Sequence, residues 1–219
     1  MERRLITVPL GPLQSNMYIV TGPSGVFVVD PSVSPEKAES YCGMPGLSKG
    51  ECHVTGLLLT HGHHDHIKYV DEWQDTYPDA KIYFSGNDKA LLSNGYMNCS
   101  YMEGSEIIYD FRFVNIAGMY GMAICKDDEF EIKVFETPGH TMGSVCYLVN
   151  NCGEKMLFTG DTVFCGSVGR TDMPGGSMKD MTESVKRIRT FDPSLKIYPG
   201  HGPDSTVGDE IKHNPFFQI

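Results

Sequence analysis

Residues 60–66 read THGHHDH and hold four of the eight histidines of the chain beside one aspartate. The stretch follows an apolar run at residues 54–59, which predicts a strand buried on both faces. Burying histidines is costly unless each ring is hydrogen-bonded or bound, and neutral imidazole is the commonest metal ligand in proteins. An exposed histidine patch or chance explains this density poorly, so the stretch predicts a metal site that the rest of the chain must complete.

The spacing within this stretch divides its side chains between two directions. His61 and His63 are two residues apart in extended backbone, so their side chains point the same way and can share one metal ion. Asp65 and His66 fall at the start of a helix predicted over residues 65–77, where the chain has turned. We therefore expect these two side chains to bind a second, adjacent ion.

Three later strands are also predicted to end in turns that present a histidine or an aspartate. These strands are predicted at residues 130–136, 155–158 and 195–198. The residues presented after them are His140, Asp161 and His201. Because ligand sites in open α/β sheets lie beyond the strand ends, we expect these turns to converge with residues 60–66.

Seven candidate ligands are too many for one tetrahedral zinc ion, so we expect two metal ions that share a ligand. The expected first ion is bound by His61, His63 and His140, the second by Asp65, His66 and His201, and Asp161 bridges both. A water between two such ions has its pKa lowered from about 15.7 to about 7, which yields a hydrolytic hydroxide at neutral pH. Asp65 is also expected to orient this hydroxide. The two divalent cations outweigh the two aspartates, so the expected substrate is a small anionic ester or thioester.

Composition narrows the class of protein further. The net charge of −10 argues against nucleic acid as a partner, because phosphate backbones are bound through clustered Lys and Arg. No apolar run reaches the length of about 18 residues that would span a membrane, and the N-terminus does not read as a signal peptide. The seven cysteines show no Cys-x-x-Cys spacing and predict free thiols in a reducing compartment. We expect a cytoplasmic protein that folds as a single domain over residues 1–219.

Strands and helices alternate along much of the chain, which predicts an α/β (α+β) fold. Further strands are predicted at residues 5–10, 16–20, 25–30, 81–84 and 144–149, and helices at residues 36–41, 87–92 and 178–189. Ser34 and Pro35 form a helix start signal before the first of these helices. Residues 94–121 have no clean periodicity and are read either as a loop packed on the body or as an inserted lid or dimer contact.

Five ordered motifs resemble those of the metallo-β-lactamase superfamily. They are HxHxDH at residues 61–66, PGHTMGS at 138–144, FTGDT at 158–162, GRTD at 169–172 and PGHGPDSTVGDE at 199–210. Within that superfamily they most resemble the glyoxalase II (hydroxyacylglutathione hydrolase) group, from about residue 5 to residue 215. The resemblance implies a four-layer αβ/βα sandwich with a binuclear site at one edge of its strands. It also carries the seven ligands over onto the positions assigned above, with zinc as the expected metal and iron or manganese as alternatives.

The chain departs from full-length glyoxalase II enzymes in two respects. We expect no counterpart of their C-terminal helical domain after residue 215, and their Lys and Tyr contacts to glutathione are absent from residues 164–170, which read FCGSVGR. In both respects the chain is similar to the short, single-domain bacterial members of the group.

The leading hypothesis is a binuclear metallohydrolase of thioesters such as S-2-hydroxyacylglutathione. The nearest enzymatic alternative is a persulfide dioxygenase with one iron ion, but the PGHGP ending at residues 199–203 favours the hydrolase group. A β-lactamase fits less well, because those enzymes are exported and usually have Cys where Asp161 stands. The alternative from another class is a non-catalytic metal-binding or regulatory module, against which the complete ligand set argues.

Three polar residues near the motifs have open roles. Asp30, at the end of a predicted strand, is either a strand-end cap or a partner that orients a ligand histidine. Arg170 either binds an anionic substrate or forms a structural ion pair with Asp172. We interpret His64 as a bystander or as a contact behind the metal ligands.

Overall fold

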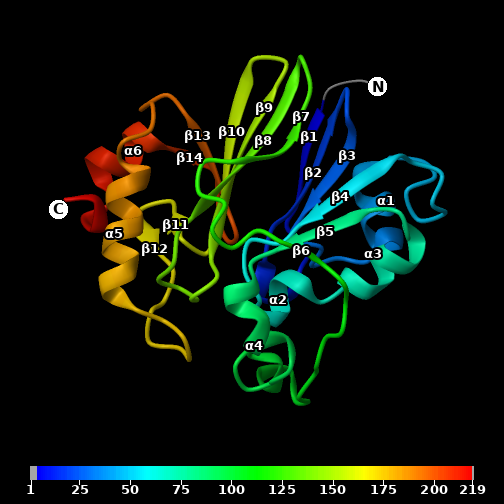
Figure 1. Cartoon of the computed structure of the whole chain (residues 1–219), viewed down its shortest axis with the longest axis horizontal. Helices are drawn as coiled ribbons and strands as arrows, with labels where there is room; N and C mark the ends of the chain where they lie inside the picture. Colours follow the sequence, from blue (N-terminus) through cyan, green and yellow to red (C-terminus); the bar gives the residue numbers. More distant parts are fainter. Residues whose placement is uncertain (1–3, 219) are drawn as a thin grey trace.

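Two β-sheets lie face to face, and helices cover the outer face of each (Figure 1). The computed structural model describes residues 4–218. The first sheet has the order β1 (Arg4–Val8), β2 (Met17–Gly22), β3 (Gly25–Val29), β4 (Val54–Leu58), β5 (Lys81–Phe84) and β6 (Val114–Asn115). The second has the order β14 (Ser205–Thr206), β13 (Lys196–Pro199), β10 (Glu154–Gly160), β9 (Val145–Asn151), β8 (Phe130–Glu136) and β7 (Ala123–Lys126). This architecture confirms the predicted four-layer αβ/βα sandwich.

The direction of pairing changes within each sheet. Strands β1, β2 and β3 form antiparallel pairs, whereas β4 runs parallel to both β3 and β5. In the second sheet β7 to β10 pair antiparallel, and β13 runs parallel to β10. Since β4, β10 and β13 each end in a motif that carries ligands, their parallel pairings bring those turns to one edge of the sandwich.

The central strands bury side chains on both faces of their sheet, with successive residues packing in different layers. In β2, Met17 and Ile19 pack in the layer between the first sheet and its helices, whereas Tyr18 and Val20 pack between the two sheets. All six residues of this strand are buried. This two-sided burial explains why the strands read as nearly continuous apolar runs.

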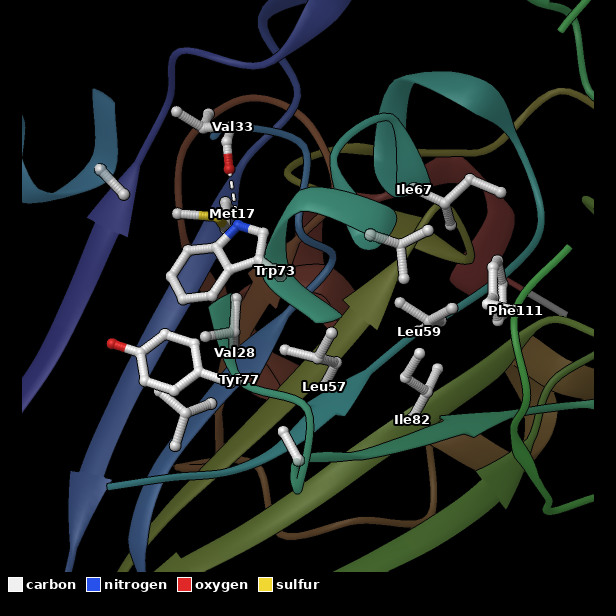
Figure 2. Packing of buried hydrophobic residues seen from close by; sticks show 14 of the residues in the cluster. Met17, Val28, Val33, Leu57, Leu59, Ile67, Trp73, Tyr77, Ile82 and Phe111 are labelled. Carbon is white, nitrogen blue, oxygen red and sulfur yellow. Dashed lines mark hydrogen bonds between the residues drawn. The ribbon is translucent and has the colours of Figure 1, made fainter. Parts of the chain in front are cut away.

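Helices α1 (Pro35–Cys42) and α3 (Val70–Thr76) cover the first sheet, and α5 (Met178–Ile188) and α6 (Val207–His213) cover the second (Figure 1). Figure 2 shows Trp73 of α3 packed above the first sheet, with its indole Nε1 donating a 2.7 Å hydrogen bond to the Val33 carbonyl. The predicted cap is confirmed, since Ser34 accepts a hydrogen bond from the Lys37 amide at the start of α1. Among residues 4–218, no helix has the length and apolarity needed to cross a membrane.

The single helix predicted over residues 65–77 is wrong. Two helices occur instead, α2 (His64–Ile67) and α3, and Tyr69 between them has φ −110° and ψ 17°. The Tyr69 amide donates a 3.0 Å hydrogen bond to the Pro31 carbonyl rather than to a helical partner. This tertiary contact turns the chain, so that α2 carries Asp65 and His66 of the ligand cluster while α3 packs on the sheet.

Several short elements were not expected from the sequence. The helix predicted at residues 87–92 is shorter in the structure, as α4 (Lys89–Leu92), whereas the elements without a prediction are β6, β7, β14, α6 and the hairpin of β11 (Val163–Phe164) and β12 (Ser167–Val168). Their lengths are too small to show a period. Residues 94–121 are mostly irregular, with a 3-10 helix η3 (Ser100–Glu103), and Tyr109 and Phe111 from this segment are buried against the first sheet.

A buried carboxylate ties loops of the two sheets together at the ligand edge. Asp88 is fully buried and accepts hydrogen bonds from the Gly62 amide at 3.0 Å, the Gly143 amide at 2.6 Å and the Thr141 hydroxyl at 2.7 Å. Burial raises the pKa of Asp88, and these three donors oppose that rise. Gly62 lies between two candidate ligands and Thr141 follows a third, so one side chain fixes both loops.

We expect Asp88→Asn to lower the free energy of unfolding by about 1–3 kcal/mol, because the amide nitrogen that replaces one carboxylate oxygen leaves a buried donor without an acceptor. Urea denaturation of the variant and the wild type measures this loss. The matched control is Asp79→Asn, since Asp79 is exposed. A loss no greater than that of the control would show that the Asp88 hydrogen bonds do not hold the two loops.

Candidate metal centre

The structure brings all seven predicted ligand residues together at the strand-end edge of the sandwich. Donor atoms of His61, His63 and His140 lie within 4.8 Å of one another. A second group with the same separation consists of Asp65, His66 and His201. These two triplets are the ones that spacing and strand ends predicted.

Asp161 lies between the two triplets. Its Oδ1 is 3.3 Å from His66 Nε2, and its Oδ2 is 3.5 Å from His140 Nε2 and 3.7 Å from His201 Nε2. One carboxylate therefore faces both groups, as a bridging ligand must. The backbone at Gly200 approaches this carboxylate so closely that a Cβ there would lie 2.2 Å from Asp161 Oδ1, which explains the glycine of the PGH turn.

The outer nitrogens of three of the histidine rings face protein groups. His66 Nδ1 lies 2.9 Å from Asp30 Oδ2, His140 Nδ1 lies 2.8 Å from the Arg170 carbonyl, and His61 Nδ1 lies 3.0 Å from the Thr60 hydroxyl. Each of these rings can therefore direct Nε2 toward the centre. Metal-binding histidines are commonly oriented in this way by a carboxylate or a carbonyl.

One buried atom of the cluster lacks a partner that a metal ion would supply. His61 Nε2 is buried and has no hydrogen-bond partner among residues 4–218. A buried polar atom without a partner is costly, and a metal ion would satisfy it. Nitrogen and oxygen donors of this kind suit zinc, iron or manganese.

Two histidines of the first triplet and the carboxylate between the triplets have charge states that suit cations. Burial lowers the pKa of His61 well below its ordinary value, and burial together with His140 lowers the pKa of His63 to about 3, so both rings are neutral. Burial alone would raise the pKa of Asp161, but His66 and neighbouring histidines hold it well below its ordinary value. Neutral imidazoles and ionised carboxylates are the forms that bind metal. Burial would lower the pKa of His66 and His201, but Asp65 and Asp161 raise it, so an ion bound by these two rings would displace protons.

Asp30 contacts the centre through His66. Its carboxylate also accepts hydrogen bonds from the Thr60 amide at 2.8 Å and the Thr60 hydroxyl at 2.7 Å, and the residue is buried. Asp30, His61 and His66 form a third group of closely spaced donors, but the Thr60 contacts already occupy the Asp30 carboxylate. The geometry favours an orienting partner of His66 over a simple strand-end cap.

Arg170 and His64 lie beside the two triplets. The Arg170 guanidinium makes two 2.9 Å hydrogen bonds to Asp172, and both side chains are largely exposed. The His64 ring is buried and contacts the Tyr109 hydroxyl and Glu103, which belong to the segment 94–121. His64 is thus held outside both triplets.

A short segment that the sequence did not single out links the ligand loops. The Ser15 hydroxyl donates a 2.7 Å hydrogen bond to the Asp65 carbonyl, and the Asn16 amide donates a 2.7 Å hydrogen bond to the Gly200 carbonyl. Ser15 also forms an isolated β-bridge with His201. Neither residue lies in a motif, so only the folded chain reveals this role.

Known relatives are similar in sequence to this chain over most of its length. A model of the metallo-beta-lactamase superfamily matches residues 10–201. The probable metallo-hydrolase YqgX of Bacillus subtilis (strain 168) is 31% identical over 211 residues, which cover 95% of each chain. The probable polyketide biosynthesis zinc-dependent hydrolase PksB of the same organism is 30% identical over 197 residues, which cover 88% of this chain and 76% of PksB.

Two solved structures are also similar. BLEG-1, described as a B3 metallo-beta-lactamase, has a TM-score of 0.85 and 30% identity, and the match covers 99% of this chain and 100% of BLEG-1. A di-iron-bound form of TTHA1623 has a TM-score of 0.79 and 32% identity, with coverage of 96% and 99%. Fold, motif order and sequence agree, and the chain belongs to the metallo-β-lactamase superfamily.

Proposed function

We propose that this protein is a binuclear metallohydrolase that cleaves thioesters, with S-2-hydroxyacylglutathione as the reference substrate. The observation that carries the proposal is the position of Asp161, whose carboxylate faces both ligand triplets. Two bound divalent ions would supply a Lewis acid and lower the pKa of a coordinated water from about 15.7 to about 7. The glyoxalase II-like motifs support the choice of thioesters.

The residues of the chain would bind the two ions and orient the reacting groups. His61, His63 and His140 would hold one ion, and Asp65, His66 and His201 the other. Asp65 Oδ2 lies 3.1 Å from His201 Nε2, so this carboxylate faces the other ligands of the second triplet and would also orient a nucleophile bound there. Asp30 and Thr60 fix the ring of His66 and the turn after β4.

Zinc is the first metal to test, with iron and manganese as alternatives. The relative PksB is described as zinc-dependent, whereas the TTHA1623 structure is described as di-iron-bound. The donor set of five imidazoles and two carboxylates accepts each of these ions. The expected substrate is a small anionic molecule, and we place the protein in the cytoplasm.

Three other functions can be distinguished from thioester hydrolysis by the ions that the protein binds and the substrates that it converts. A mononuclear-iron persulfide dioxygenase would bind one ion, so the number of ions per chain distinguishes it from a binuclear hydrolase. Hydrolysis of β-lactams is a second candidate because of the likeness to BLEG-1. A non-catalytic metal-binding module would bind ions without turning over any substrate.

Elemental analysis after zinc loading should give about two ions per chain, as expected for a binuclear site. His201→Ala removes one ligand of the second triplet, so its content should fall toward about one ion per chain. His213→Ala, at an exposed histidine, is the matched control and should keep the wild-type content. Fewer than one ion in the loaded wild type would rule out the binuclear site.

Zinc-, iron- or manganese-loaded protein should hydrolyse S-lactoylglutathione, and His61→Ala should lose at least about 100-fold in kcat/KM, since losing even a group that supports a ligand costs 10–100-fold. The panel includes an oxygen ester, a β-lactam and a persulfide, with oxygen uptake recorded for the last. Turnover of the persulfide with oxygen uptake would establish the dioxygenase. Absence of hydrolysis with every metal and every ester would contradict the proposed function.

A further inference from the structure

A cavity of about 240 Å³ opens directly onto the two ligand triplets. On one side it is lined by candidate ligands, namely His63, Asp65, His140, Asp161 and His201. Its remaining wall is formed by Leu13, Cys99, Met102, Phe164, Arg170 and Met173. Arg170 is the one charged residue of that wall, and its guanidinium is paired with Asp172. The surface opposite the metal ligands is therefore mainly apolar.

Leu13 and Met102 are exposed on this wall although they are large apolar side chains. Leu13 is 68% exposed and Met102 is 57% exposed. Phe164, from the β11–β12 hairpin, places its ring 6.0 Å from the ring of His201, edge to face. Apolar surface left open beside a catalytic centre marks a site for an apolar ligand.

The backbone that presents two of these wall residues is strained. Leu13 has φ 54°, its neighbour Gln14 has φ 62°, and Cys99 has φ 68°, a region that side chains other than glycine seldom adopt. Among residues 4–218, only two other non-glycine residues have positive φ, and one of them, Asp30, contacts His66. Such conformations persist where surrounding contacts impose them, and they gather at ligand sites.

The residues that follow Leu13 are hydrogen-bonded to the ligand loops. Ser15 bonds to the Asp65 carbonyl, and the Asn16 side chain donates to the Pro199 carbonyl at 3.0 Å. These bonds fix the backbone two or three residues beyond Leu13 to the turns that carry Asp65 and His201. The Leu13 side chain lines the cavity and is largely exposed, so an apolar group that enters can pack against it.

We propose that Leu13, Met102, Phe164 and Met173 form a subsite for a short apolar chain attached to the scissile group of the substrate. This inference rests on the proposed hydrolase function and narrows its substrate class. The volume of about 240 Å³ lies below the roughly 300–1,000 Å³ of pockets for drug-sized ligands, so the chain has few carbons. Methionine side chains adapt their shape, which suits chains of slightly different length.

Binding of straight-chain carboxylates to zinc-loaded protein tests the subsite without catalysis. Acetate, butyrate, hexanoate and octanoate carry one head group and differ only in the chain. We expect the Kd from calorimetry to fall about three- to fourfold for each added methylene until the cavity is full, since each buried methylene contributes about 0.8 kcal/mol. Equal Kd values for acetate and hexanoate would overturn the subsite.

Two variants assign the effect to the wall. Leu13→Gly removes the side chain and accepts the positive φ without strain, and Met102→Gln keeps the length but adds a polar group. In both variants the Kd should fall less than twofold for each added methylene. Met122→Ala is the matched control, because Met122 is 54% exposed and does not line the cavity. An undiminished gain in both wall variants would overturn the proposal.

Kinetic measurements then show whether the apolar chain belongs to the acyl group or to the thiol. They also distinguish the proposed subsite from the proposed hydrolase function. One series varies the acyl chain on N-acetylcysteamine, and the other varies an alkyl thiol with a constant acetyl group. A rise in kcat/KM with chain length in the first series places the acyl chain in the subsite, and a rise in the second places the thiol chain there. Chain-dependent carboxylate binding without any hydrolysis supports the subsite and contradicts the hydrolase. Hydrolysis that is independent of chain length in both series supports the hydrolase and overturns the subsite.

Discussion

The structure depends on enclosing a dense group of ionisable side chains at one edge of two sheets. His61 and His66 are almost completely buried, and Asp161 lies against both triplets. Bringing such groups together out of water is costly unless each is oriented and its charge is compensated. Asp30, Thr60 and the Arg170 carbonyl orient three of the rings, and bound cations would compensate the charge that remains.

This requirement also explains the backbone around the site. Turns from both sheets must approach within contact distance of the ligands, and glycine permits this approach where a Cβ would collide. At Gly143 a Cβ would lie 2.6 Å from the Asp88 carboxyl carbon, and at Gly200 it would lie 2.2 Å from Asp161 Oδ1. Asp88, Ser15 and Asn16 then hold these turns in register by hydrogen bonds across the sandwich. Hydrogen bonds thus hold the polar side of the site from several directions.

The opposite side of the cavity is built differently. Apolar side chains there are exposed, and Leu13 and Cys99 are presented from strained backbone. A fixed polar side that positions the reacting group and an adaptable apolar side that accepts a chain are separate physical tasks. The superfamily motifs provide the first, whereas residues outside the motifs provide the second. Substrate class therefore depends on the less recognisable part of the chain.

Strand ends and ligand spacing are local patterns, and from them the sequence predicted an α/β fold and the seven residues gathered at the site, whereas the four-layer sandwich was implied by the resemblance to a known superfamily. Helix boundaries that depend on a distant partner could not be predicted from the sequence. The break at Tyr69 is an example, because the Pro31 carbonyl accepts the hydrogen bond of the Tyr69 amide. Asp88, Ser15 and Leu13 carry no local signal, since each acts on residues far along the chain. How the loops are fixed and what lines the cavity became evident only from the folded chain, because those properties arise from which side chains meet across the two sheets.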